Sequence, residues 1–183
     1  MYKVAAALLI ALISAMPSLG VAAEWDVDMA ASRLGFSIDL SGARTNGHFA
    51  DWVAHVSFDP DRPDLSTVTV EVMTGSIVVE ASEAMDVVGE PAWLDSKAMP
   101  DAVFRTTSIA WQEGGLVADG TLSLKAVERP LTLSGALTIE GDRASATLTG
   151  SIPRDEYGIG PVGGFVGPVV DLDITILATR RMP

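Results

Sequence analysis

The two histidines have the widest range of chemistry in this sequence, since imidazole serves as a base, a metal ligand or a proton shuttle. His48 and His55 lie seven residues apart, so on one continuous strand they point to opposite faces and cannot share a metal ion or a substrate. A serine nucleophile would need one of them, and the Gly-x-Ser-x-Gly pattern is absent. The sequence therefore predicts no catalytic site built on histidine.

Acidic side chains form the next candidate, because Asp59, Asp61 and Asp64 are spaced like the start of a calcium-binding loop. That loop needs a glycine at its sixth position and a glutamate at its twelfth, which here are Asp64 and Val70. Asp171 and Asp173 alternate with apolar residues, which predicts a solvated strand face. We therefore expect no catalytic residue, no cofactor and no metal ion.

Composition narrows the function further. The 183 residues suit one domain, and 12 Lys+Arg against 24 Asp+Glu give a net charge of −12. Nucleic acids and anionic membrane surfaces need a basic patch, so neither is an expected partner. The chain has no cysteine, which excludes disulfides, thiol catalysis and cysteine-ligated metals.

The N-terminal residues predict a signal peptide over 1–23. Lys3 is the only charge in this stretch, an apolar run follows it, and small residues precede the expected cleavage after Ala23. The unbroken apolar stretch is too short for a membrane anchor, which needs roughly 20 residues. We expect a mature domain of residues 24–183 in the periplasm or secreted, and no later stretch could span a bilayer.

Alternation of apolar and polar residues dominates the mature chain and predicts an all-β domain of antiparallel strands. The alternating runs cover residues 34–40, 48–58, 68–72, 116–124, 131–139, 144–152 and 170–176. Ser41-Gly42 and Asn46-Gly47 are among the predicted turns. Residues 80–98 lack alternation, and Ser82 is expected to cap a short helix there.

Small residues recur on the inward faces of these strands, among them Gly120, Gly135 and Gly150. One explanation is that a barrel needs glycine where its strands bend. The other is that small inward residues leave an interior that a ligand fills, since an eight-stranded barrel can hold one small ligand. The sequence leaves both open.

Several short motifs, in order along nearly the whole mature chain, resemble the YceI-like family of lipocalin-like, polyisoprenoid-binding proteins. They are Trp25-Asp26-Val27-Asp28, the strand Ser32–Ile38, Gly47-His48-Phe49, Val56–Pro60, Trp93-Leu94-Asp95, Gly120–Leu124, Arg129–Leu133 and Pro153–Gly160. The resemblance implies an eight-stranded antiparallel lipocalin-like barrel with a short helical insertion and a long apolar pocket for an isoprenoid chain. The chain departs from the family pattern at residues 39–44, at 86–89 and at Met99.

The alternation nominates inward residues as the wall of that pocket: Leu34, Phe36, Ile38, Trp52, Leu122, Leu133, Leu137 and Ile174. From the irregular segment, Met85, Trp93 and Leu94 are expected to cap one end. Three arginines are candidates for an anionic head group, Arg33, Arg44 and Arg154, with Arg154 favoured because it lies in the family-like Arg-x-x-Tyr-Gly-Ile-Gly run.

We therefore expect an exported, non-enzymatic protein that holds an isoprenoid or related lipid or quinone chain. Two alternatives stay open. One is a barrel enzyme acting on an apolar substrate through a carboxylate or Tyr157, which would place a titratable side chain inside the cavity. The other is a structural envelope protein, which would present an exposed apolar patch. A homodimer is also left open.

Overall fold

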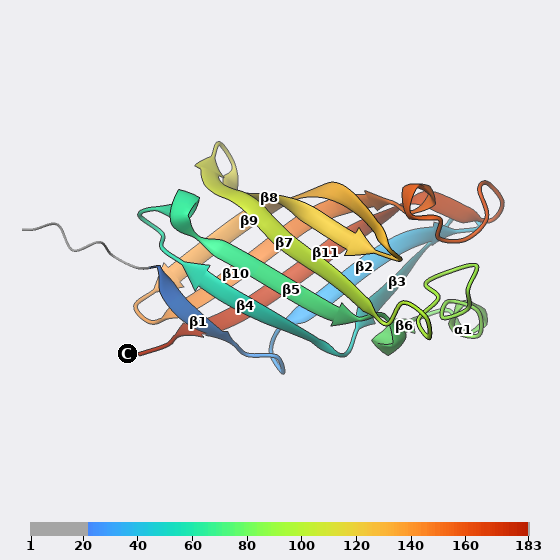
Figure 1. The fold of residues 1–183 in the computed structure, drawn as a ribbon, viewed down its shortest axis with the longest axis horizontal. Helices are drawn as coiled ribbons and strands as arrows, with labels where there is room; N and C mark the ends of the chain where they lie inside the picture. Colours follow the sequence, from blue (N-terminus) through green and yellow to red (C-terminus); the bar gives the residue numbers. More distant parts are fainter. Residues whose placement is uncertain (1–21, 183) are drawn as a thin grey trace, which may run out of the picture.

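Strands make up most of the computed structural model, which describes residues 22–182, so residues 1–21 of the predicted signal peptide lie outside it. Within that range eleven strands form one sheet (Figure 1). No helix of the described residues is long and apolar enough to cross a membrane. The strands are β1 (Ala23–Val27), β2 (Arg33–Leu40), β3 (Ala43–Phe49), β4 (Trp52–Phe58), β5 (Thr67–Met73), β6 (Ile77–Val79), β7 (Asp101–Gln112), β8 (Gly115–Leu124), β9 (Val127–Glu140), β10 (Arg143–Pro153) and β11 (Val166–Arg180).

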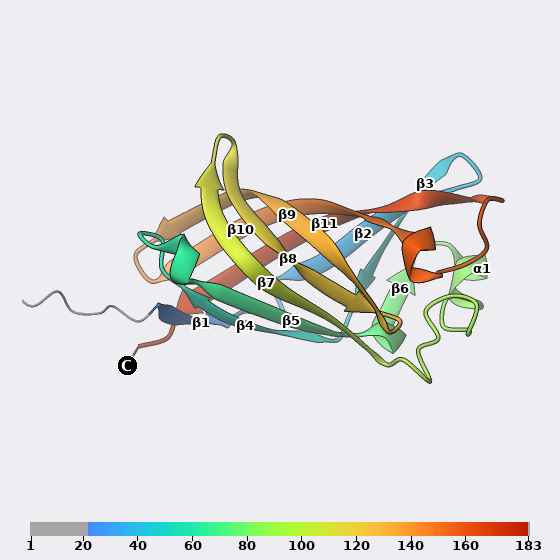
Figure 2. The ribbon, with the colours of Figure 1, turned by 45° about the horizontal axis from the view of Figure 1, so that its top comes forward.

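Eight of these strands close into a barrel in the order β1-β4-β5-β7-β8-β9-β10-β11. The ring closes because the end of β11 pairs antiparallel with β1, Trp25 opposite Arg180 and Val27 opposite Ala178. Figure 2 shows these strands wrapped around a common interior. The predicted eight-stranded antiparallel barrel is confirmed.

The other three strands extend the sheet beyond the ring. Before it reaches β1, β11 pairs with β2 between Val166 and Thr175, and β2 continues through β3 to β6. Strand β11 is long enough to serve both partners because its apolar alternation continues past Ile176 to Ala178. The extension lies at the end of the barrel opposite the chain's C-terminus (Figure 1).

The structure corrects the predicted turn at Asn46-Gly47 and the single strand over 48–58. Both turn residues lie inside β3, and the chain turns instead at Ala50-Asp51 before β4. Gly47 is there because a side chain would overlap the ring of Phe36 on the facing strand. The Asn-Gly pair therefore reflects packing rather than a hairpin turn.

The irregular segment between β6 and β7 closes the end of the barrel opposite the chain's C-terminus, which we call the closed end. It contains α1 (Ser82–Met85), whose first residue is Ser82 and whose N-cap is Ala81, so the predicted cap is displaced by one residue. Leu94 from this segment is buried. Lys125, in the β8–β9 turn, donates hydrogen bonds from Nζ to the carbonyl oxygens of Pro91 at 2.9 Å and Gly158 at 2.8 Å. Those bonds tie the segment to the barrel and to η3 (Arg154–Tyr157).

Gly135 lets β9 approach β10 closely. A side chain there would overlap the carbonyl oxygen of Thr147 and come within 3.0 Å of the Leu148 Cα. Gly135→Ala is expected to lower the free energy of unfolding by about 2 kcal/mol, because overpacking against backbone cannot relax by a rotamer change. Urea unfolding measures this. Gly75→Ala is the matched control, since its added methyl meets only Ser96 Cβ at 3.8 Å, and an equal loss in both variants would contradict the argument.

Candidate apolar cavity

The barrel encloses an apolar cavity of about 220 Å³. All eight barrel strands contribute to its wall, together with β2 and β3. Its lining residues include Trp25, Leu34, Phe36, Phe49, Val56, Phe58, Val70, Phe104, Ile109, Leu116, Ala118, Leu122, Leu133, Leu137, Ala144, Ala146, Leu148, Ile174, Ile176 and Ala178. Hydrocarbon is the chemistry that such a wall favours, since burial of apolar surface is its main source of binding free energy.

The wall offers almost no polar chemistry. Its one side-chain hydroxyl belongs to Thr106, whose Oγ1 accepts a hydrogen bond from Val68 N at 2.9 Å and donates one to Val68 O at 3.3 Å. No lining residue has a titratable side chain. The described lining residues therefore present a ligand with hydrocarbon and one bonded hydroxyl.

Six of the predicted wall residues line this cavity, and five lie elsewhere. Those that line it are Leu34, Phe36, Leu122, Leu133, Leu137 and Ile174. Ile38 lies near the end of β2, beyond the cavity, and Trp52 is buried at the start of β4. Met85 is partly exposed and accepts a hydrogen bond from Val79 N through its sulfur.

Trp93 and Leu94 belong to the closed end and not to the cavity wall. The ring of Trp93 packs on Gly160, where an added Cβ would lie 2.7 Å from it. Leu94 is buried in the core. Both residues belong to the irregular segment at the closed end, and neither lines the cavity.

The inward glycines and alanines have different roles, which answers the question the sequence left open. The space above Gly120 is filled by the Phe104 ring, and that above Gly150 by the Leu133 side chain. These glycines serve close packing. Alanines, including Ala144 and Ala146, are among the residues that border the cavity.

Arg154 is buried, with 2% of its surface exposed, and its guanidinium is already bonded. Its Nε donates to Gly167 O at 2.7 Å, its Nη1 to Ile159 O at 2.6 Å and Pro161 O at 3.1 Å, and its Nη2 to Pro161 O at 3.1 Å and Val166 O at 2.8 Å. All five N–H donors of a guanidinium are thereby used. The prediction of Arg154 as a head-group partner is not supported, because this side chain holds the loop between η3 and β11 in place.

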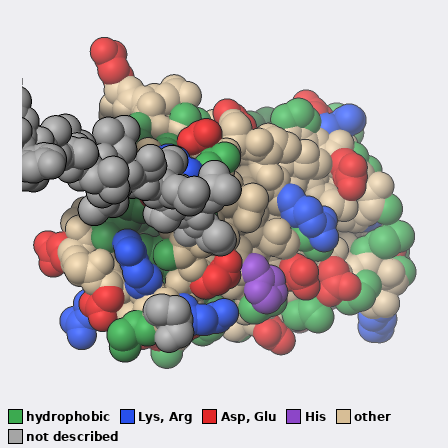
Figure 3. Space-filling view, turned by 60° about the vertical axis from the view of Figure 1, so that its left-hand side comes forward, with side chains coloured by type: hydrophobic (Ala, Val, Ile, Leu, Met, Phe, Trp, Pro, Cys, Tyr) green, Lys and Arg blue, Asp and Glu red, His purple; other side chains and the backbone are tan. Residues whose placement is uncertain are grey.

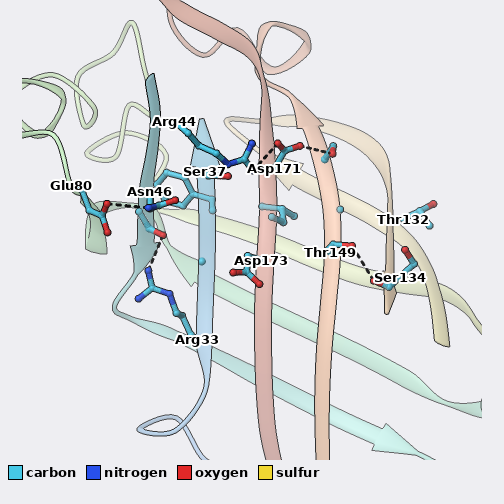
Figure 4. A pocket seen from close by; sticks show the side chains of 16 residues that line it. Arg33, Ser37, Arg44, Asn46, Glu80, Thr132, Ser134, Thr149, Asp171 and Asp173 are labelled. Atoms are coloured by element: carbon cyan, nitrogen blue, oxygen red, sulfur yellow. Dashed lines mark hydrogen bonds and ion pairs between the residues drawn. The ribbon is translucent and has the colours of Figure 1, made fainter. Parts of the chain in front are cut away.

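Arg33 and Arg44 lie on the outer face of the sheet, in a polar groove of about 710 Å³ whose lining shares Gly35, Phe36 and Leu172 with that of the cavity. Arg44 forms an exposed ion pair with Asp171 at 3.1 Å, and Asp171 accepts a second hydrogen bond from Ser151. Figure 4 shows Arg33, Arg44 and Asp171 with the hydroxyl side chains of β9 and β10. Neither arginine lines the apolar cavity.

Tyr157 is also outside the cavity wall. Burial raises the pKa of its hydroxyl above the ordinary value, so the group stays protonated near neutral pH. This does not support the alternative in which Tyr157 acts as a base on a bound substrate.

The end of the barrel formed by β1, the β9–β10 turn and the end of β11 is the open end. Inward side chains there, including Ala144, Ala146 and Ala178, are only half buried although they point into the barrel. The closed end differs, since Leu94 and Tyr157 are buried there. Figure 3 looks at the open end and shows hydrophobic side chains recessed among charged ones.

Reasoning from the sequence did not nominate several cavity residues near the open end, notably Trp25 and Phe58. Phe58 was available from its alternating run, and Trp25 only from a short strand of five residues, which gives little periodicity. The alternation of β11 also continues inward through Ala178 to Arg180. The sequence signal that could have indicated Arg180 is a charged residue at the end of this apolar alternation.

A closed antiparallel barrel around an apolar, non-titratable cavity defines a lipocalin-like protein. The YceI-like domain model matches residues 25–178, and the chain belongs to the YceI-like family. A UPF0312 protein of Pseudomonas putida strain F1 is 30% identical over 164 residues, which cover 85% of this chain and 81% of the relative. A UPF0312 protein of Shewanella sp. strain W3-18-1 is 28% identical over 176 residues, which cover 85% and 92%.

Solved structures show the same fold. BcnA of Burkholderia cenocepacia superposes with a TM-score of 0.79 at 23% identity, covering 84% of this chain and all of the other. The Campylobacter jejuni YceI protein gives 0.65 at 18% identity, covering 75% and 85%. A polyisoprenoid binding domain from Saccharophagus degradans gives 0.59 at 12% identity, covering 88% and 100%.

Proposed function

We propose that this protein is an exported carrier or store that holds the chain of an isoprenoid or related lipid or quinone and catalyses no reaction. The observation that carries the proposal is the apolar barrel cavity, whose lining has no titratable side chain. The Saccharophagus domain of the same fold is described as polyisoprenoid-binding, which supports the same ligand class. The absence of a lining acid or base gives no support to the enzyme alternative.

Apolar burial alone supplies enough affinity for such a ligand. Each buried methylene contributes about 0.8 kcal/mol, so six of them give roughly 5 kcal/mol before ordering costs. A cavity of about 150 Å³ holds benzene, whereas this one measures about 220 Å³. A prenyl chain of several units therefore has to extend through the open end or spread the wall.

Mass spectrometry of bound lipid tests the proposal. The full-length protein is expressed in a bacterial host, purified without detergent, extracted with organic solvent and analysed. We expect a prenyl lipid or quinone near one equivalent per chain. An extract without lipid, together with no uptake of added geranylgeraniol, would overturn the proposal.

A further inference from the structure

The open end of the cavity has a cation at an inward position. Arg180 pairs with Trp25 across β11 and β1, and its guanidinium carbon lies 5.0 Å from the centroid of the Trp25 ring. Trp25 lines the cavity, has 3% of its surface exposed, and donates from Nε1 to Phe58 O at 3.1 Å. The Arg180 guanidinium therefore lies against the ring of Trp25, a buried and hydrogen-bonded residue of the cavity wall.

The strand alternation separates Arg180 from the acidic residues of β1. Inward positions of β11 pass through Ala178 to Arg180, whereas Arg181 points to the outer face and forms an ion pair with Asp26. The hydrogen bond from Arg181 lowers the pKa of Asp26, which fits a carboxylate that already has its cation. Among the described residues no carboxylate oxygen lies within 4.0 Å of the Arg180 guanidinium.

Most inward positions around Arg180 are uncharged, including Ile139, Ala144 and Ala178. The charged neighbour is Asp142 at the β9–β10 turn, whose backbone oxygen accepts a hydrogen bond from Arg180 N at 2.7 Å. Because the Trp25 ring covers one face of the guanidinium, the N–H groups at its edge stay directed to the surroundings, in the planar arrangement that suits phosphate and carboxylate. An anion deep in the apolar cavity would lose its hydration without compensation. At the open end the anion stays partly hydrated and lies beside the Arg180 guanidinium.

We propose that Arg180 binds the anionic head group, phosphate or carboxylate, of a lipid whose chain occupies the cavity. This rests on the proposed function. It places the head group at the end opposite the irregular segment and Arg154, and at a residue different from the three arginines that the sequence nominated. The cavity binds the apolar chain of the lipid, and Arg180 favours a lipid with an anionic head group.

Matched ligand pairs test the inference. Binding of geranylgeranyl phosphate and geranylgeraniol is measured by quenching of tryptophan fluorescence for the wild type, Arg180→Gln and Arg181→Gln. We expect the wild type to prefer the phosphate, and Arg180→Gln to weaken phosphate binding about tenfold while changing alcohol binding less than about twofold. Arg181→Gln removes the same charge one residue away, on the outer face, and is expected to change neither by more than about twofold at 0.15 M salt.

A second pair, palmitate and hexadecanol, distinguishes a carboxylate from a phosphate head group. If Arg180→Gln weakens binding of palmitate alone, the head group is a carboxylate. If it weakens binding of geranylgeranyl phosphate alone, the head group is a phosphate. Equal wild-type affinity for the charged and neutral members of both pairs would overturn the head-group inference and leave the proposed function standing. So would equal weakening of charged and neutral ligands in a folded Arg180→Gln variant. Failure of the wild type to bind any of the four overturns the proposed function itself.

Discussion

Arg154→Ala is expected to lower the free energy of unfolding by about 3 to 5 kcal/mol, the range for removing one partner of a buried charged network. The truncation leaves four backbone carbonyls, those of Ile159, Pro161, Val166 and Gly167, without the donor that now satisfies them. Each buried polar group left unpaired costs about 1 to 3 kcal/mol. Water entering the site recovers part of this loss, which is why the expected total is below the sum.

Urea unfolding followed by tryptophan fluorescence measures this loss, and amide exchange locates it. Residues 159–167 are expected to lose protection first, since their carbonyls are the ones that Arg154 holds. Arg154→Lys is also expected to destabilise the protein, because an ammonium has three donors at one point and cannot reach all four carbonyls. Arg44→Ala is the matched control, since its ion pair is exposed and such pairs contribute about 0 to 1 kcal/mol. Equal effects at Arg154 and Arg44 would contradict the structural role of Arg154.

The barrel could be predicted from the sequence because apolar and polar residues alternate along most of its strands, although the run over 48–58 crosses the turn between β3 and β4. Strand β7 is absent from the alternating runs because the bulge between Thr106 and Ser108 shifts its inward positions from Phe104 to Ile109, so neither parity holds over the whole strand. Asn46-Gly47 was misassigned because Asn-Gly is the strongest short hairpin signal. Only the position of the Phe36 ring, which the register of the β2–β3 hairpin fixes, reveals why glycine is needed there.

The residues of the candidate site could be predicted only where the alternation shows which side chains point inward. Inward residues such as Leu122 and Ile174 follow from it, whereas no sequence pattern shows which inward residues border empty volume. Which arginine lies near the cavity opening depends on the topology of the strands. Arg154 lies in a family-like motif, yet its loop folds back over it and takes every donor. Arg180 lies outside every recognised motif and reaches the open end only because β11 is shared between β2 and β1.

The two ends of the barrel differ in chemistry, and this difference gives the cavity a direction. At the closed end, Lys125 and Arg154 are bonded to backbone carbonyls, so opening it would leave charged groups and carbonyls unpaired. At the open end the inward residues of β10 and β11, including Ala144, Ala146 and Ala178, are small and half buried. A ligand chain that enters through the open end breaks none of these bonds, which is why we expect entry and exit there.

Ala146→Phe is expected to weaken binding of geranylgeraniol by at least about 100-fold while the protein stays folded. Ala146 lines the cavity between Leu137 and Ile176 on the neighbouring strands. The added ring has about the size of benzene, for which a cavity of about 150 Å³ suffices, so it fills most of the 220 Å³ available. Displacing four methylenes from the cavity removes about 3 kcal/mol of binding free energy, which corresponds to the stated loss. Filling empty apolar volume keeps the change in stability within about 1 kcal/mol.

Thr147→Phe is the matched control for this prediction. Thr147 is the next residue of β10, points outward and is exposed, so the same ring there leaves the cavity unchanged. Its geranylgeraniol affinity is expected to stay within about twofold of the wild type, since no wall contact changes. Thermal unfolding of both variants verifies that they fold. A folded Ala146→Phe variant that binds geranylgeraniol as tightly as Thr147→Phe would place the chain elsewhere, and the outer groove of Arg33 and Arg44 would then be the site to probe.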